Sequence, residues 1–258
     1  MKRIVTIVLL LAATFANAQS GTATNIGPEG AWTNVISATI LNDKMYTVEK
    51  NGAIYETDLV STFRTQIGKR EFEKGKFIFA ANNMLYVIDY EGTMFKVNAT
   101  TGVKEQLGIK GTWSQMYAYT VCKDLFYSVN SLGALTATDL KTNTTREMGN
   151  TYVNVTNMFA TGDKIYLLEQ SGKLHEMSSV NGAQKMISPN NTWTGILCGT
   201  GYKSGVYMID KMGSLYSLAT GSKNKMGKAE FSLARFLLGA NGNLYFIEST
   251  GSLYEIKL

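Results

Sequence analysis

Short apolar runs recur along this chain, and each is followed by a polar residue, a glycine-containing turn and a second run that mixes apolar and polar residues. The pattern appears six times, at residues 44–58, 84–98, 124–139, 164–178, 205–219 and 241–256. The turn glycines lie 38 to 41 residues apart, at Gly52, Gly92, Gly133, Gly172, Gly213 and Gly251. A fixed period near 40 residues is a signature of stacked or radial repeats, so the pattern predicts a repeat protein.

Each repeat reads as four short strands. The first precedes the hairpin, as at 76–82 and 235–241, and the next two are hairpin arms joined where glycine supplies the positive φ of the turn. The fourth is a more polar run that usually ends in glycine, as at 64–68 and 104–108. Second strands such as 85–89 are apolar at consecutive positions, which indicates burial on both faces. Propeller blades meet this requirement because each sheet lies between two neighbours.

The two ends of the chain predict that the repeats close into a ring. The sixth repeat stops at Leu258 after its third strand, and the segment 22–32 aligns with 103–113, which holds a fourth strand. Pairing of that segment with the last repeat would leave no open sheet edge, whereas an open solenoid would need capping repeats. We therefore predict an all-β fold, a closed six-bladed β-propeller of four-stranded antiparallel blades whose N-terminal segment completes the last blade. One domain would span 19–258, with repeats near 30–69, 70–109, 110–150, 151–190, 191–230, and 231–258 plus 20–29.

One strand-turn-strand segment carries a resemblance to known propellers. Residues 97–108 (VNATTGVKEQLG), after a strand that begins Gly-x-Met-Phe, resemble the repeats of quinoprotein-type propellers, and the likeness extends loosely over all six units. The chain lacks the tryptophan that recurs on the fourth strand of that family, so neither the family's cofactor nor its catalytic residues carry over. The repeat also resembles tachylectin-like propellers in outline, without a motif that would transfer a sugar site.

Residues 1–18 have the features of a secretory signal peptide: Lys2 and Arg3, an apolar run at 4–13 and small residues at 16–18. We expect an exported chain, secreted or periplasmic, with no lipid anchor because no cysteine follows the cleavage site. No later apolar run approaches the roughly 20 residues that span a bilayer. The formal net charge is +5, and the charges beyond the leader alternate in sign, which disfavours nucleic acid as a partner. We also expect a monomer without a cofactor.

The two cysteines, Cys122 and Cys198, do not make a disulfide framework, because a domain of this length can bury its own core. One bridge between them stays open, and we favour two buried free thiols. Four sequons matter only if the source glycosylates them; they lie at Asn98, Asn143, Asn154 and Asn190.

A polar residue stands three positions before each turn glycine, and five of the six are acidic: Glu49, Asp89, Asn130, Glu169, Asp210 and Glu248. Carboxylates arranged around a ring would suit a cation such as Ca²⁺, which makes them weak metal candidates. Short polar side chains also start hairpin turns by accepting hydrogen bonds from the turn backbone. A role present in every blade is more consistent with architecture, so we favour the turn interpretation and expect no metal.

Another set of residues differs between alternate repeats. Trp32, Trp113 and Trp193 open the odd repeats and are followed by Thr or Ser, whereas Phe72, Tyr152 and Phe231 stand in the even ones. Tryptophan beside hydroxyl groups can stack on a sugar or anchor a protein, but alternating aromatics could equally fill the wedge between blades, which we favour. Lys76 and Arg235 occupy matching first-strand positions. With the three tryptophans they form the candidate ligand-binding set near the mouth of the central channel.

The residues that an enzyme would need are scarce. The only histidine, His175, occupies a slot held elsewhere by aromatic residues, and no Ser-His-Asp set, histidine metal site or phosphate loop is visible. We therefore name no catalytic residue and expect a non-catalytic module that binds a glycan or a protein at the channel-mouth face. The alternative is a metal-dependent, lactonase-like hydrolase that uses carboxylates around the channel, an idea that rests on fold analogy.

Overall fold

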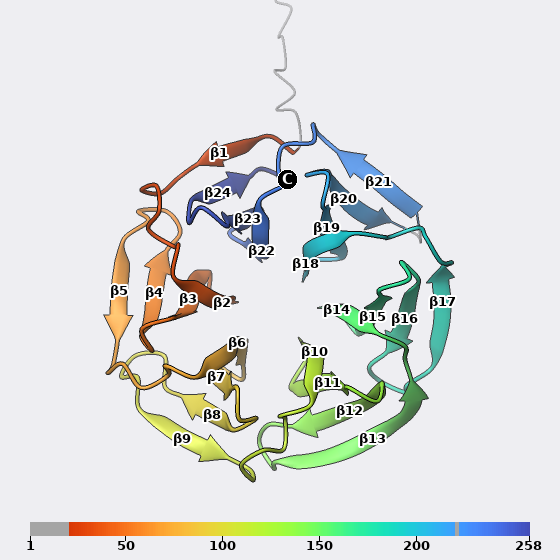
Figure 1. Ribbon diagram of the computed structural model, residues 1–258, viewed down its shortest axis with the longest axis horizontal. Coiled ribbons are helices and arrows are strands. Elements are labelled where there is room, and N and C mark those ends of the chain that lie inside the picture. Colours follow the sequence, from red (N-terminus) through yellow and green to blue (C-terminus); the bar gives the residue numbers. More distant parts are fainter. Residues whose placement is uncertain (1–20, 220–221) are drawn as a thin grey trace, which may run out of the picture.

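The computed structural model describes residues 21–219 and 222–258, and the predicted leader at 1–18 lies outside them. Within that part of the chain 24 strands form six four-stranded antiparallel sheets arranged as blades around a central opening (Figure 1). The predicted six-bladed β-propeller is confirmed. No helix in the described ranges has the length and apolar character that crossing a membrane requires.

The strands run outward from the channel in chain order within each blade, except that the outer strand of blade six comes from the N-terminal end of the chain. Blade one holds β2 (Val35–Leu41), β3 (Lys44–Glu49), β4 (Ile54–Asp58) and β5 (Arg64–Ile67). Blade two holds β6 (Gly75–Ala81), β7 (Met84–Asp89), β8 (Met94–Val97) and β9 (Lys104–Leu107). Blade three holds β10 (Met116–Cys122), β11 (Leu125–Asn130), β12 (Ala134–Asp139) and β13 (Thr144–Thr151).

The remaining blades follow the same order. Blade four holds β14 (Val155–Thr161), β15 (Lys164–Glu169), β16 (Leu174–Ser178) and β17 (Gln184–Ser188). Blade five holds β18 (Ile196–Tyr202), β19 (Gly205–Asp210), β20 (Leu215–Ala219) and β21 (Ser222–Met226). Blade six holds β22 (Ala234–Ala240), β23 (Asn243–Glu248), β24 (Leu253–Ile256) and, on its outer edge, β1 (Ala23–Asn25).

The N-terminal strand closes the ring as predicted. Strand β1 pairs antiparallel with β24, with Thr24 opposite Glu255, and the Ile26 N–H continues the ladder to the Leu253 carbonyl at 3.0 Å. In Figure 1 the red N-terminal strand lies outside the dark blue C-terminal hairpin. Since the outer strand of blade six comes from the opposite end of the chain, the ring is held shut by backbone hydrogen bonds.

The second strand of each blade is buried on both faces. In β7, for example, the four central residues are all buried, and β11 and β23 show the same pattern. The reason is geometrical, because each blade packs against a neighbour on either side. The consecutive apolar positions in the sequence reflect this double burial.

Every seam between neighbouring blades contains one hydrophobic cluster. Each cluster includes one aromatic residue from the connection that leads into the following blade. We call these residues the connecting aromatics; they are Trp32, Phe72, Trp113, Tyr152, Trp193 and Phe231. The inner strands approach more closely across the seams with phenylalanine or tyrosine than across those with tryptophan.

The turn glycines lock consecutive blades together. The Gly92 carbonyl in blade two accepts a hydrogen bond from the backbone N–H of Trp113 at 3.1 Å, and each other turn glycine does the same for the next connecting aromatic. The two segments approach so closely that a methyl carbon on Gly92 would lie 2.1 Å from Ser114 N. Gly92 also has φ of +78°. Glycine is therefore needed there for two independent reasons.

Candidate functional site

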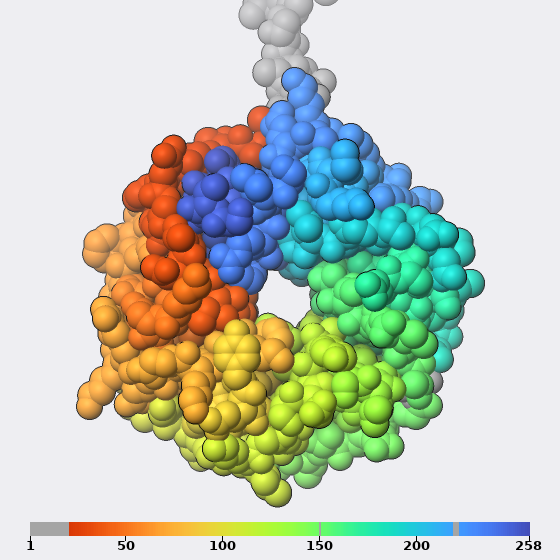
Figure 2. Space-filling model, in the orientation of Figure 1, coloured from red at the N-terminus to blue at the C-terminus, as the bar shows by residue number. Residues whose placement is uncertain are grey.

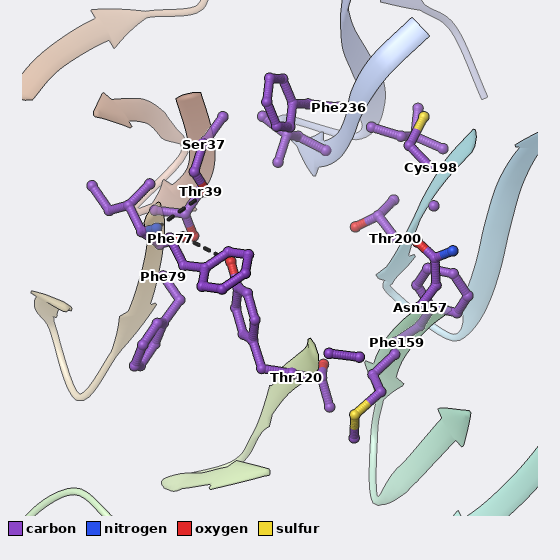
Figure 3. A pocket seen from close by; sticks show the side chains of 18 of the residues that line it. Ser37, Thr39, Phe77, Phe79, Thr120, Asn157, Phe159, Cys198, Thr200 and Phe236 are labelled. Carbon is purple, nitrogen blue, oxygen red and sulfur yellow. Dashed lines mark hydrogen bonds between the residues drawn. The ribbon is translucent and has the colours of Figure 1, made fainter. Parts of the chain in front are cut away.

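A channel of about 590 Å³ runs along the axis of the ring. The space-filling view shows its opening at the centre of the disk (Figure 2). The walls come from the inner strands of all six blades, β2, β6, β10, β14, β18 and β22. The side chains labelled in Figure 3 likewise come from all six, so a group in the channel would meet every blade.

The channel lining is mixed in polarity and holds few ionisable groups. Phe77 and Phe236 face Asn157 and Thr200 across it (Figure 3), and its residues include two cations but no aspartate, glutamate or histidine. The Cys198 thiol is buried, and burial raises its pKa to about 12. A thiol with that pKa stays protonated at neutral pH and is a poor nucleophile.

Backbone groups on the channel side are partly satisfied by neighbouring blades. The Ile78 N–H donates to Ser37 Oγ at 3.1 Å, and the Tyr119 hydroxyl donates to the Ile78 carbonyl at 3.2 Å. Burial raises the pKa of Tyr119 to about 12, which keeps this hydroxyl protonated as a donor. The backbone of one residue in β6 thus connects three blades.

Each inner strand carries a β-bulge at its first step. The register with the second strand shifts between residues such as Gly75 and Phe77, so one residue per blade is left outside the ladder. The same shift occurs in all six blades. The bulge residues all line the channel; they are Ile36, Lys76, Tyr117, Thr156, Leu197 and Arg235. Because bulges redirect side chains, this ring forms one mouth of the channel.

Lys76 and Arg235 thus lie together in the ring of bulge residues, on the two blades that flank blade one. Lys76 Nζ donates to the Met116 carbonyl at 3.3 Å, and Arg235 Nη2 donates to the Val35 carbonyl at 2.8 Å. Both cations also lie over the ring of the next residue, at 4.9 Å for Phe77 and 5.1 Å for Phe236. Neither forms an ion pair within the described ranges.

The face on which the inner strands begin exposes many large apolar side chains. It consists of the bulges, the turns between second and third strands, and the connections between blades, and we call it the channel-mouth face. Its exposed apolar residues are Tyr90, Ile109, Tyr117, Leu132, Val153, Leu197, Met212 and Leu233. On the opposite face Val60, Phe63, Val103 and Val180 are exposed in the turns between the two outer strands, away from the channel.

The three tryptophans lie inside the seams. Trp32, Trp113 and Trp193 are 0%, 6% and 1% exposed, and the Trp193 indole N–H donates to Ser188 Oγ at 3.1 Å. Such burial is what the wedge-filling interpretation expects. A ligand on the surface would not reach these rings, so their part in ligand binding stays a prediction that the geometry does not support.

The acidic ring occupies the positions at which the hairpin turns begin. Asp89 Oδ1 accepts from the Thr93 N–H at 2.8 Å, and Asp210 and Asn130 make the equivalent bonds. Glu49 pairs with Arg64, whose guanidinium also lies 5.3 Å from the Trp32 ring. Asp89, Asn130 and Asp210 thus hydrogen-bond the turn backbone, as the turn interpretation expects, whereas the Glu49 carboxylate is engaged by Arg64.

Glu169 differs from the rest of the ring because its partner is the single histidine. His175 Nε2 lies 3.0 Å from Glu169 Oε1, and the imidazole meets the Tyr152 ring edge-on at 5.3 Å. His175 is a packed residue, as predicted. Cys122 and Cys198 are both buried and free.

Within the described ranges no three His, Cys, Asp or Glu side chains come together to hold a metal ion. The lining residues of the channel in this part of the chain include no carboxylate either. The hydrolase alternative required carboxylates around the channel, so it stays a prediction without a matching site.

Sequence reasoning identified Lys76 and Arg235 but not the other four bulge residues. Ile36, Tyr117, Thr156 and Leu197 occupy the same position in the alignment of repeats, four residues after each connecting aromatic. That alignment could have found them. The sequence does not indicate that the leucines and the methionine of this face are exposed, because an apolar residue in a loop can be buried or face solvent.

Known proteins resemble this chain in fold. No protein-family model and no curated protein matches it. Among solved structures, BamB from Moraxella catarrhalis is 17% identical, with a TM-score of 0.52 over 86% of this chain and 71% of that one. Virginiamycin B lyase from Staphylococcus aureus is 9% identical, with a TM-score of 0.62 over 92% and 98%. YCF48 bound to D1 peptide is 15% identical, with a TM-score of 0.61 over 87% and 77%. These likenesses support the propeller fold.

Proposed function

We propose that this protein is an exported, non-catalytic binding module that recognises a polypeptide segment on its channel-mouth face. The observation that carries the proposal is the presence of eight exposed large apolar side chains on the turns, connections and bulges of that face, two of which, Tyr117 and Leu197, line the channel. Large exposed apolar patches with polar surroundings mark interaction sites in soluble proteins. YCF48, a propeller of similar fold, has been solved with a bound peptide, which supports this kind of ligand.

Two seams hold these apolar residues in pairs. The Gly133 carbonyl accepts from the Tyr152 N–H at 2.9 Å, which fixes the turn with Leu132 against the segment with Val153. The Gly213 carbonyl does the same for Phe231 at 3.0 Å and so fixes Met212 near Leu233. These exposed side chains stand on hydrogen-bonded turns and segments, so binding would order little of the protein.

A polypeptide fits this surface better than a neutral glycan. Sugar rings stack on exposed aromatic faces; the three indoles are buried, and six of the eight exposed apolar residues of this face are aliphatic, with Tyr90 and Tyr117 the two aromatic ones. Leucine, methionine and valine contribute much of the exposed area, and these side chains pack against other apolar side chains.

The test is to pan a random-peptide library against the protein and to measure each selected peptide by fluorescence anisotropy, with a glycan array in parallel. We expect L132S/V153S and M212S/L233S each to weaken binding by about tenfold or more. The matched control V60S/V180S removes two equally exposed valines from the opposite face and should change affinity less than about twofold. Equal losses in the control, or glycan binding with no peptide selected, would contradict the proposal.

A further inference from the structure

We infer that the polypeptide bound on the channel-mouth face places a carboxylate in the channel mouth, where Lys76 and Arg235 hold it. The inference rests on the proposed function and specifies the chemistry of the partner. It follows from the charge, the geometry and the surroundings of the six bulge positions.

The mouth carries positive charge without a neutralising partner. Among the described residues that line the channel, Lys76 and Arg235 are the two cations and none is a carboxylate. The channel-mouth cations Lys74 and Lys110, by contrast, both pair with Glu91. Field lines concentrate in a narrow opening of a single sign, so the mouth attracts anions.

Both cations keep donors for a ligand. Each makes one hydrogen bond to a backbone carbonyl of the next blade, which fixes its head group at the mouth. A lysine ammonium has three N–H donors and a guanidinium has five. Both residues are only partly buried, so the remaining donors can meet a carboxylate that enters from the face.

The remaining bulge residues determine what surrounds that carboxylate. Ile36 lies between the two cations, and Tyr117 and Leu197 follow on either side, 66% and 40% exposed. An anion bound here therefore has three apolar side chains beside it, while the polar Thr156 lies on the blade opposite Ile36. A segment with an aspartate, a glutamate or a terminal carboxylate flanked by apolar residues matches both properties.

The experiment uses two synthetic, fluorescein-labelled peptide libraries of leucine, phenylalanine, serine and glycine. One carries aspartate at two fixed positions and the other carries asparagine there. Binding to the full mature chain is measured by anisotropy at about 50 mM and about 500 mM salt. We expect the aspartate library to bind about tenfold tighter and to lose most of that advantage at high salt.

The variant K76Q/R235Q should remove the preference for aspartate, whereas its control K50Q/K211Q should keep it. Lys50 and Lys211 are exposed on turns of the same face but do not line the channel, so the control removes equal charge. Thermal unfolding of both variants establishes that they are folded.

Equal binding of both libraries, with loss in L132S/V153S, would overturn this inference and leave the proposed function standing. Equal loss in K50Q/K211Q would overturn it too, because general surface charge would then explain the preference. Binding of neither library would refute both proposals. A heparin hexasaccharide that binds through Lys76 and Arg235 where peptides fail would identify an anionic glycan and overturn the inference.

Discussion

Replacement of Gly92 by alanine tests the claim that turn glycines lock the blades. Gly92 has φ of +78°, and its carbonyl accepts the Trp113 N–H. An added methyl carbon would lie 2.1 Å from Ser114 N and 2.7 Å from the Trp113 carbonyl carbon. Both neighbours are backbone atoms, so relief requires the turn and the connection to separate. The substitution should therefore break the contact between blades two and three.

The expected cost has two parts that a second variant can separate. The left-handed conformation lowers the free energy of unfolding of an alanine variant by about 1 to 2 kcal/mol. The lower conformational entropy of its unfolded chain offsets about 0.4 to 1 kcal/mol of that loss. Loss of the hydrogen bond leaves a buried N–H unsatisfied, at about 1 to 3 kcal/mol. Gly162 has φ of +61° with nothing within 4 Å of an added methyl, so G162A carries only the first part.

Urea denaturation should show G162A less stable than the parent by about 1 kcal/mol or less and G92A by about 3 kcal/mol. For a chain of this size the loss of about 3 kcal/mol in G92A corresponds to a Tm roughly 6 to 12 °C below that of the parent. If G92A lost no more stability than G162A, the contact between Gly92 and the segment at Trp113 would not contribute to stability. The claim that the turn glycines hold neighbouring blades together would then be wrong.

Three further predictions follow from the same structure. Deletion of residues 21–27 should lower the melting temperature of the whole domain, because it removes the strand that closes blade six, and an unchanged value would refute closure. Cys122 and Cys198 should not react with a thiol reagent near neutral pH until urea unfolds the protein, since both are buried; rapid labelling of the native chain would contradict this. Chelator and added Ca²⁺ should leave thermal stability unchanged, because Asp89 and Asp210 accept from the turn backbone while Glu49 and Glu169 are engaged by Arg64 and His175; a large stabilisation by Ca²⁺ would reveal a metal site.

The architecture was readable from the sequence because one spatial unit repeats with a fixed period. Double burial appears as consecutive apolar residues, and each hairpin turn appears as a glycine. Strand boundaries agreed to within one to two residues; β6, for instance, covers Gly75–Ala81 where 76–82 was expected. The closing strand was predicted because the N-terminal segment 22–32 aligns with 103–113, which holds the fourth strand of blade two.

The candidate site was less readable. A bulge is a shift of one residue in backbone pairing. Lysine and tyrosine, the residues at the bulge positions Lys76 and Tyr117, also occur at regular strand positions, so the residue type does not reveal the bulge. The tryptophans are conspicuous in the sequence because they alternate. Their exposure, however, depends on how two neighbouring blades pack against each other, and the local sequence does not reveal this. The set of residues predicted from the sequence therefore combines two that line the channel, Lys76 and Arg235, with three tryptophans buried in the seams.

Two periods in the chain explain why recognition is expected at the bulges. The period near 40 residues builds a blade, and the tryptophans repeat over twice that distance because the seams alternate in width, the wider ones taking the larger ring. Where the same kind of residue recurs with either period, packing within or between blades explains the recurrence. The six bulge positions obey neither, since no two carry the same residue: Ile36, Lys76, Tyr117, Thr156, Leu197 and Arg235. Packing imposes no common side chain there, so these positions can be adapted to a ligand at the least cost to the fold.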